Sequence, residues 1–310
     1  MKRITAAALT AVALLMLAAG PASAAKLFYV GSNGADTAAC GTITRPCRTI
    51  VYVLGVALDG DRIVVGPGVY SGFQLDMAVS LESTHGAGAT VIQGGEPVID
   101  VSAGADGAVI GKPSQGFMIT GGTVGILVNA ADVRIEDNVL VGVYTGVQGN
   151  AAAPRLTVAG NLISASVGVE VRGAAASIVQ NVIHGDGLGW GIRSQGVGIV
   201  VSDNVVTGAQ WGAELAIGPA TVRRNTFAAN RYGVGIHVSS LVLTSNNFLG
   251  NGSGGLNCGV MGSYPQNLSG NYWGSERGPG VAPADQACGL LLVTTPFLRA
   301  PVPVNSTGGR

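Results

Sequence analysis

Charged residues are scarce in this chain: Asp, Glu, Lys and Arg make up 11% of its 310 residues, against about 25% in an average soluble domain. The 17 basic and 17 acidic residues cancel, so no long-range field draws the protein to nucleic acid or to an anionic membrane surface. Hydrophobic residues still account for 47%, and this much apolar material excludes a disordered chain. The composition predicts a folded protein that does not bind nucleic acid.

Long apolar runs are absent from the sequence after Ala24. Lys2 and Arg3 precede an apolar run over 6–19, and the small residues at 21–24 fit a signal peptidase site. This run is shorter than the roughly 20 residues that a membrane span needs. We expect a signal peptide over 1–24 that is cleaved after Ala24, and a secreted or periplasmic protein without a membrane span.

Cysteine is rare as well, with four residues in the chain. In an exported protein an even number of cysteines predicts disulfides, and four cysteines allow three pairings. We expect Cys40 to pair with Cys47 and Cys258 to pair with Cys288. No C-x2-C spacing is present and the three histidines are scattered, so the sequence predicts no zinc site.

Glycine, by contrast, is abundant, with 50 in the chain, and it recurs with asparagine in a repeat. An asparagine returns at nearly even intervals, and a glycine that opens a short β-type stretch follows it within the same interval. The asparagines are Asn138, Asn161, Asn181, Asn204, Asn225, Asn246 and Asn271, and the glycines are Gly146, Gly168, Gly191, Gly212, Gly233, Gly254 and Gly278.

A period of about 22 residues, made of short strands with no intervening helix, predicts an all-β parallel β-helix. We expect each asparagine to occupy a left-handed turn position and its amide to join a ladder along the solenoid. Branched residues such as Val169 and Val171 should face the core. The predicted parts are an N-terminal cap and first rung over 25–75 with a helix over 48–58, the repeats over 76–278, and a C-terminal cap and tail over 279–310.

Two further motifs carry a family resemblance. Two stretches near the N-terminus resemble the first rung of secreted right-handed β-helix proteins of the pectate-lyase-like superfamily. The first is C-x6-C-R-T-I, which begins at Cys40, and the second is G-D-R-I-V-V-G-P-G-V-Y, which ends at Tyr70. The later G-N-Y-W-G at 270–274 is similar to theirs as well. The resemblance covers about residues 26 to 299 and implies a right-handed parallel β-helix. This superfamily includes lyases, hydrolases, epimerases and proteins without known catalysis, so the resemblance implies no single activity.

The resemblance also implies that a substrate lies on the outward face of one parallel sheet, and we expect that sheet to be the one opened by the glycines. Glu170, Arg193 and Glu214 come second after the glycine on three successive rungs, and Arg172 comes fourth. One interpretation is a structural ion-pair ladder, since neighbouring opposite charges stabilise a sheet by about 0.2 to 1 kcal/mol per pair. The other interpretation is a binding or catalytic site.

The catalytic interpretation takes two forms. A hydrolase needs two carboxylates of which one acts as an acid, but Arg193 between Glu170 and Glu214 would keep both of them ionised. A uronan lyase needs a basic residue that takes a proton beside a sugar carboxylate, and Arg193 fits this role better, with Glu170 and Glu214 as candidate calcium ligands. The usual dense cluster of Asp residues is absent, which favours a non-catalytic surface or structural protein as the alternative.

Aromatic residues are also few, at 5% of the chain, yet three of them directly precede the strand-opening glycine on consecutive rungs. We expect these to form a stack beside the charged face, which suits either sugar rings or the sealing of turns. The predicted polysaccharide-binding residues, with an acidic glycan as a candidate ligand, are Arg172, Trp190, Trp211, Tyr232 and Asn150. Asp203 and Arg224 are expected to pair on another face, and His237 to be a surface residue.

Overall fold

The computed structural model describes residues 24–237, 240–257, 266–280, 284–287 and 292–306. The predicted signal peptide therefore lies almost entirely outside the described residues, and so does the expected pairing of Cys258 with Cys288. Within the described part, no helix is long and apolar enough to cross a membrane.

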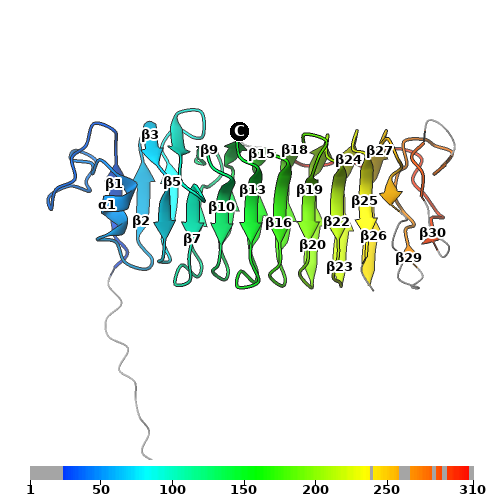
Figure 1. The fold of residues 1–310 in the computed structure, drawn as a ribbon, viewed down its shortest axis with the longest axis horizontal. Helices are drawn as coiled ribbons and strands as arrows, with labels where there is room; N and C mark the ends of the chain where they lie inside the picture. The colour runs from blue at the N-terminus through cyan, green and yellow to red at the C-terminus, as the bar shows by residue number, and fades with distance from the viewer. Residues whose placement is uncertain (1–23, 238–239, 258–265, 281–283, 288–291, 307–310) are drawn as a thin grey trace, which may run out of the picture.

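The chain winds into a parallel β-helix whose rungs each add one strand to three long sheets (Figure 1). Sheet 1 contains β1 (Leu27–Val30), β2 (Arg62–Val65), β5 (Ser80–Ser83), β8 (Val109–Ile110), β11 (Arg134–Glu136), β14 (Thr157–Ala159), β17 (Ser177–Val179), β20 (Ile199–Ser202), β23 (Ala220–Arg223) and β26 (Leu241–Thr244). Sheet 2 contains β3 (Gly68–Ser71), β6 (Thr90–Gln93), β9 (Met118–Thr120), β12 (Val139–Val141), β15 (Leu162–Ser164), β18 (Val182–His184), β21 (Val205–Thr207), β24 (Thr226–Ala228) and β27 (Asn247–Leu249). Sheet 3 contains β4 (Phe73–Leu75), β7 (Ile99–Val101), β10 (Val124–Val128), β13 (Thr145–Gly149), β16 (Val167–Val171), β19 (Trp190–Ser194), β22 (Trp211–Leu215), β25 (Tyr232–Ile236) and β28 (Leu256–Asn257). A separate pair joins β29 (Gln266–Asn267) to β30 (Leu292–Val293).

The core consists of inward-facing side chains that lie in register from rung to rung. In sheet 3, Val147, Val169, Ile192, Ala213 and Val234 are aligned along one column, and all are fully buried. Val171 is also buried. The predicted inward positions are therefore confirmed, and the alternate positions of sheet 3 face outward.

The asparagine ladder is confirmed, and it is continuous from Asn138 to Asn271. Asn204 illustrates each step: its Nδ2 donates to Oδ1 of Asn225 at 2.9 Å and to the carbonyl of Ile178 at 2.8 Å. All seven predicted asparagines are fully buried. Each amide forms hydrogen bonds with backbone groups at the corner between sheets 1 and 2. The ladder thus supplies hydrogen-bond partners to buried backbone groups that would lack them in a tight turn.

The expected left-handed conformation of these asparagines is wrong. The residue before each one takes the positive φ instead, as at Asp137 (54°), Gln180 (58°) and Asp203 (60°). The turn thus places the positive φ on the residue before the asparagine, while the asparagine keeps an ordinary backbone and its amide is buried.

The strand-opening glycines are required by close packing at the corner between sheets 2 and 3. A Cβ at Gly168 would come within 2.5 Å of the Ile183 side chain and 2.4 Å of the Gly191 carbonyl. The same conflict recurs at each of the corresponding glycines. At the C-terminal end the column continues through Gly255 rather than the predicted Gly254, since Gly255 aligns beside Gly233. Gly278, also predicted to open a strand, lies in a turn with φ of 85°.

The N-terminal cap contains a short helix, α1 (Ile50–Leu54), in place of the longer helix predicted over 48–58. Thr49 caps its N-terminus by accepting a hydrogen bond from the Tyr52 amide, and Gly55 follows its last residue. Ile50 and Val53 are buried against the core. This short helix therefore covers part of the open end of the solenoid.

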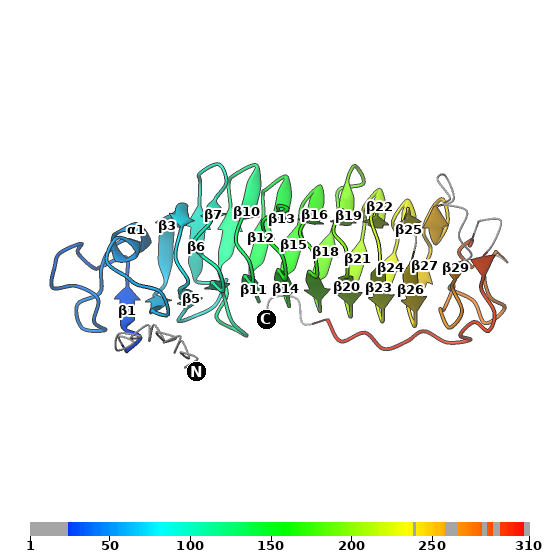
Figure 2. The ribbon, with the colours of Figure 1, turned by 90° about the horizontal axis from the view of Figure 1, so that it is seen from below.

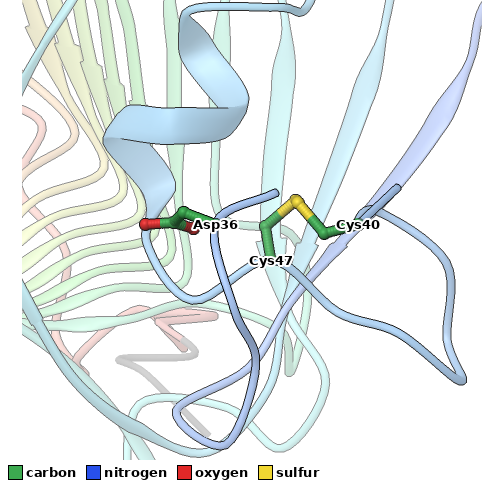
Figure 3. A group of neighbouring side chains, drawn as sticks. All are labelled: Asp36, Cys40 and Cys47. Atoms are coloured by element: carbon green, nitrogen blue, oxygen red, sulfur yellow. A yellow bond between two sulfur atoms is a disulfide. The ribbon is translucent and has the colours of Figure 1, made fainter. Parts of the chain in front are cut away.

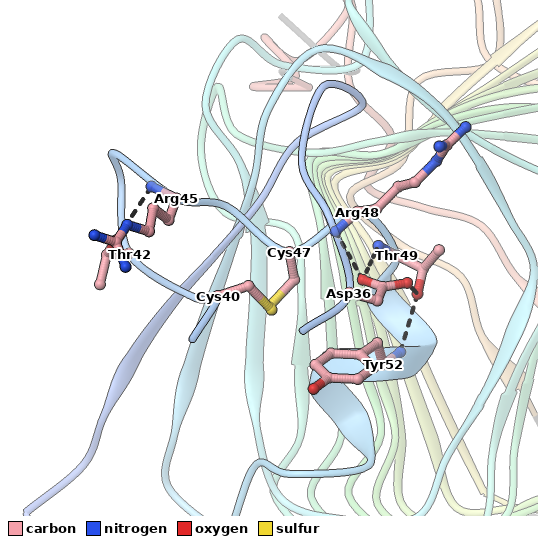
Figure 4. The surroundings of a disulfide bond; sticks show 8 residues. All are labelled: Asp36, Cys40, Thr42, Arg45, Cys47, Arg48, Thr49 and Tyr52. Carbon is pink, nitrogen blue, oxygen red and sulfur yellow. Dashed lines mark hydrogen bonds between the residues drawn. A yellow bond between two sulfur atoms is a disulfide. The ribbon is translucent and has the colours of Figure 1, made fainter. Parts of the chain in front are cut away.

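The expected disulfide between Cys40 and Cys47 is present in this cap (Figures 3 and 4). Asp36 lies near both cysteines, and these are the only three metal-ligand-type side chains that cluster within the described part of the chain. The disulfide leaves no thiolate to bind a metal. Asp36 instead accepts hydrogen bonds from the amides of Arg48 and Thr49 and from the Thr49 hydroxyl (Figure 4). Desolvation raises the pKa of Asp36, but these hydrogen bonds outweigh it and the pKa lies below its usual value.

The C-terminal residues cover the other end of the core and then turn back. Trp273 is fully buried and stacks on Phe248 with ring centroids 4.7 Å apart. The last described segment runs back beside the body of the solenoid (Figure 2). It is fastened where the side chain of Asn247 exchanges two hydrogen bonds of 2.8 Å with the backbone of Val302.

Candidate functional site

The outer face of sheet 3 brings together the charged residues that the sequence singled out. Parallel pairing aligns Gln148, Glu170, Arg193, Glu214 and Gly235 in one column across β13, β16, β19, β22 and β25. These strands lie side by side in Figure 1. The register thus places three charged side chains on neighbouring rungs, as predicted.

These side chains form a chain of alternating charge. Arg193 lies between two carboxylates: its Nη1 is 3.5 Å from Oε1 of Glu170, and its Nε donates to Oε2 of Glu214 at 3.2 Å. Nε2 of His237 is 3.7 Å from Oε1 of Glu214. His237 is therefore part of the same cluster and is not an isolated surface residue. We call Glu170, Arg193, Glu214 and His237 the charged column.

Arg172 extends the charged column sideways. Its Nη2 donates to Oε1 of Glu170 at 3.0 Å, and its side chain is 45% exposed, whereas that of Glu170 is 10% exposed. Arg193 is 30% exposed and Glu214 is 18% exposed. The two arginine side chains are therefore more accessible than the two carboxylates, in a cluster whose formal charges balance.

Asn150 belongs to a separate amide network on earlier rungs. Its Nδ2 donates to Oδ1 of Asn129 at 2.7 Å, and its Oδ1 accepts from Nε2 of Gln148 at 3.2 Å. Asn150 precedes Arg172 by one rung in the second outward column of sheet 3. The polar face therefore continues past the charged column toward the N-terminal end.

The three aromatic residues do not form one continuous stack. Trp211 and Tyr232 stack with centroids 4.5 Å apart, but the Trp190 ring instead carries the guanidinium of Arg193, whose Cζ is 4.5 Å from the ring centroid. The Arg231 guanidinium lies 5.4 Å from the Tyr232 centroid, a contact that the sequence pattern does not predict. Trp190 thus holds Arg193 by a cation–π contact, and Trp211 and Tyr232 border the cluster on later rungs.

The carboxylates of the charged column do not fit a calcium site. Calcium takes six to eight oxygen ligands, whereas Glu170 faces Arg172 and Arg193, and Glu214 faces Arg193 and His237. A guanidinium occupies the space between the two carboxylates. The calcium role considered from the sequence is therefore not supported by this arrangement.

Other polar groups have structural roles. Arg224 donates two hydrogen bonds to Asp203, as expected. A second buried ladder, which was not predicted from the sequence, runs from Asn230 through Asn251 to Asp285. Burial raises the pKa of Asp285, against the opposing effect of hydrogen bonds from Asn251 and Gly250. Asn230 and Asn251 are one repeat apart in the sequence, and this spacing was the available signal for the second ladder.

Comparisons with known proteins agree with this architecture. A family model described as "Right handed beta helix region" matches residues 115–268. The crystal structure of pectate lyase Pel9A is similar with a TM-score of 0.54 and 13% identity, over 90% of this chain and 79% of that chain. An alginate lyase from Paenibacillus sp. is similar with a TM-score of 0.50 and 16% identity, over 82% of this chain and 98% of that chain. No curated protein sequence matches the chain. At these identities the likeness shows the fold.

Proposed function

The chain is a right-handed β-helix protein, and we propose that it binds a polysaccharide on the outer face of sheet 3. The observation that carries this proposal is that the charged column and Arg172 lie together on neighbouring rungs. Only 11% of the residues in this protein are charged, so such a cluster is not expected from composition. That two enzymes with this fold are a pectate lyase and an alginate lyase supports a polysaccharide as the ligand.

The exposure of the side chains favours an acidic glycan. Arg172 and Arg193 are more exposed than the carboxylates beneath them, so an approaching chain meets guanidinium groups first. Arginine forms strong, directional hydrogen bonds with carboxylates. We assign Arg172 and Arg193 to the sugar carboxylates, Trp211 and Tyr232 to the border of the binding face, and Asn150 to hydroxyl groups on earlier rungs.

A uronan-lyase-like activity on the same face is a second candidate, and the exposure of Arg172 favours it. Arg193 donates to a carboxylate on one side, pairs with another and lies over Trp190, which suits positioning better than proton removal. In the lyase proposal Arg172, with one carboxylate partner among the described residues, is the group that reaches the substrate, and Glu170, Arg193 and Glu214 hold it in place. A polysaccharide ligand and the disulfide of the cap also favour an extracellular or periplasmic location.

Calorimetric titration with polygalacturonate, alginate and a neutral glucan tests the binding proposal. We expect the acidic glycans to bind, and Arg172→Ala and Arg193→Ala to weaken binding at least about tenfold. Arg134→Ala is the matched control, because Arg134 pairs with Glu136 on the outer face of sheet 1. Equal affinity in all variants, or a preference for the neutral glucan, contradicts the proposal.

The absorbance of unsaturated uronates, followed with the same glycans, separates binding from lyase action. Product formation that Arg172→Ala abolishes supports the lyase candidate. Binding without product formation supports a non-catalytic protein.

A further inference from the structure

At the N-terminal end of the solenoid, the first strand of sheet 2, β3, has no backbone pairing on its outer side within the described residues. Sheet 1 starts one strand earlier than sheets 2 and 3, because β1 has no counterpart beside β3 or β4. The cap covers the edge of β1, where Cys47 donates to the Tyr29 carbonyl and Tyr29 donates to the Gly41 carbonyl. No such backbone pairing occurs along β3 within the described residues.

The backbone of β3 shows which of its groups are free. Gly68 and Gly72 donate toward the next rung, to the carbonyls of Ala89 and Gln93. Because backbone groups alternate in direction along a strand, those of Val69 and Ser71 point to the open edge. The hydrogen bonds of the described part of the chain include none to these groups.

The opposite end of the same sheet is treated differently. Phe248, in the last strand of sheet 2, donates to the Tyr272 carbonyl, and Tyr272 donates to the Asn246 carbonyl. The C-terminal cap thus pairs with its edge strand, whereas the N-terminal cap leaves β3 unpaired. Strand β3 also lacks the charges and prolines with which proteins protect exposed edges.

A cleft of about 310 Å³ lies beside this edge, near the lower limit of roughly 300 Å³ for ligand pockets. It is bounded by Val69, Tyr70 and Ser71 on the strand, by Arg48 to Val51 on the helix side and by Ser32, whose hydroxyl donates to the Pro67 carbonyl just before the strand. Val69 and Val51 are exposed apolar residues, at 60% and 56%. The cleft thus offers free backbone groups on one side and apolar contacts on both.

The charge of the cleft comes from Arg48. Its amide donates to Asp36, but its side chain points away from the disulfide (Figure 4) and makes no ion pair within 4 Å among the described residues. The negative charge of Asp36 also acts on Arg48, but this carboxylate is already engaged by the Arg48 and Thr49 amides and by the Thr49 hydroxyl. The guanidinium is therefore left as a cationic partner for a carboxylate on a segment in the cleft. This favours an acidic occupant over a basic one.

We propose that the β3 edge and its cleft form a docking site at which an extended, acidic segment of a partner protein adds a strand to sheet 2. Main-chain hydrogen bonds to Val69 and Ser71 supply affinity, as in other cases of strand addition. Contacts with Val51 and Val69 and the charge of Arg48 supply selectivity. This site lies on the cap and is independent of the outer face of sheet 3.

Fluorescence anisotropy of two labelled, blocked hexapeptides, Thr-Val-Thr-Val-Asp-Thr and Thr-Val-Thr-Val-Lys-Thr, tests the site with the full chain. We expect the Asp peptide to bind more tightly than the Lys peptide. Val69→Pro removes the edge amide and spares the bonds to β6, and it should weaken binding about tenfold or more. Val69→Ile keeps both the amide and the apolar side chain and should bind as the unchanged protein does.

Charge reversal gives a second variant that leaves β3 intact. Arg48→Glu should invert the preference between the two peptides, whereas Arg45→Glu, on the same cap but outside the cleft, should not. Binding of neither peptide at about 1 mM, or unchanged binding to a folded Val69→Pro variant, overturns the proposal. Sedimentation of the protein alone that shows a dimer dissolved by Val69→Pro would assign the edge to a second copy of this chain and also overturn it.

Discussion

The indole ring of Trp211 lies over Gly235 on the following rung, where a Cβ would come within 2.9 Å of the ring. Gly235 occupies the same outward column as Glu214. The absence of a side chain at this one position lets Trp211 lean across the face of sheet 3, and Trp211 in turn stacks on Tyr232. The end of the polar face is thus shaped by a missing side chain.

Gly235→Ala is expected to displace Trp211. The added methyl group would force the ring away from the sheet, which should shift the tryptophan fluorescence and cost about 1 kcal/mol of unfolding free energy. Glycan binding should weaken if Trp211 borders the binding face. Gly88→Ala is the control, because an added Cβ there meets no atom within 4 Å and Gly88 has no positive φ. An unchanged emission spectrum in Gly235→Ala contradicts the prediction.

Two neighbouring residues of β16 test the assignment of inward and outward positions. Val169 is fully buried, so Val169→Asp places a charge in the core and should prevent folding or lower the melting temperature strongly. Glu170→Ala removes an outward carboxylate and should cost less than Val169→Asp, because its partners Arg172 and Arg193 are partly exposed and remain hydrated after the change. Thermal unfolding by circular dichroism compares the two variants. Similar melting temperatures would show that the assignment is wrong.

The asparagine ladder gives a prediction about buried hydrogen bonds. Asn204→Ala removes an amide that donates to Ile178, Ser202 and Asn225, and each orphaned buried group costs about 1 to 3 kcal/mol. We expect a total loss of about 3 kcal/mol or more, measured by urea unfolding. Asn129→Ala, on the outer face of sheet 3, should cost less than about 1 kcal/mol. Equal losses would mean that the ladder contributes no more than a surface amide.

Glu82 gives a prediction about pH. Burial raises its pKa, but the hydrogen bonds and charges of Arg62 and Lys112 outweigh burial and hold the pKa below 4.5. A carboxylate with a lowered pKa stabilises the fold above its unfolded value, and this contribution is lost as the pH falls through the folded pKa. Glu82→Gln should therefore lower the unfolding free energy at pH 7 by about 1 to 3 kcal/mol.

The difference between Glu82→Gln and the unchanged protein should shrink as the pH is lowered below about 4.5. Urea unfolding at a series of pH values measures it. Glu276→Gln, at an exposed carboxylate without an ion pair among the described residues, is the control and should leave the unfolding free energy at pH 7 nearly unchanged. A constant difference for Glu82→Gln across the series would contradict the assignment.

The fold could be predicted because its two strongest constraints recur in the sequence. Each rung needs an amide at one corner and a residue without a side chain at another, so Asn204 and Gly212 have counterparts on neighbouring rungs. Alternation within each strand then fixed the direction of Val169 and Glu170. These constraints are local, and their regular recurrence along the chain makes them visible.

The predictions that were wrong concern features that depend on particular contacts and not on the repeat. The positive φ at Asp203 rather than Asn204 follows from the inward direction of the amide, which spacing alone does not give. Trp190 faces Arg193 instead of Trp211 because a guanidinium from its own strand occupies the ring. Glu82 is buried and pairs with the partly exposed Arg62 and Lys112, and it lies where the asparagine repeat has not yet begun. None of these contacts has a periodic signature.

The repeated corners have a consequence for the length of the molecule. The chain advances by the same number of residues from Asn204 to Asn225 as from Asn225 to Asn246, and each advance presents to its neighbour the same buried amide and the same glycine gap. Removing or duplicating one such unit leaves both kinds of junction complete. The solenoid can therefore lengthen or shorten only in whole rungs of about 4.8 Å. The number of rungs sets the distance between its two caps.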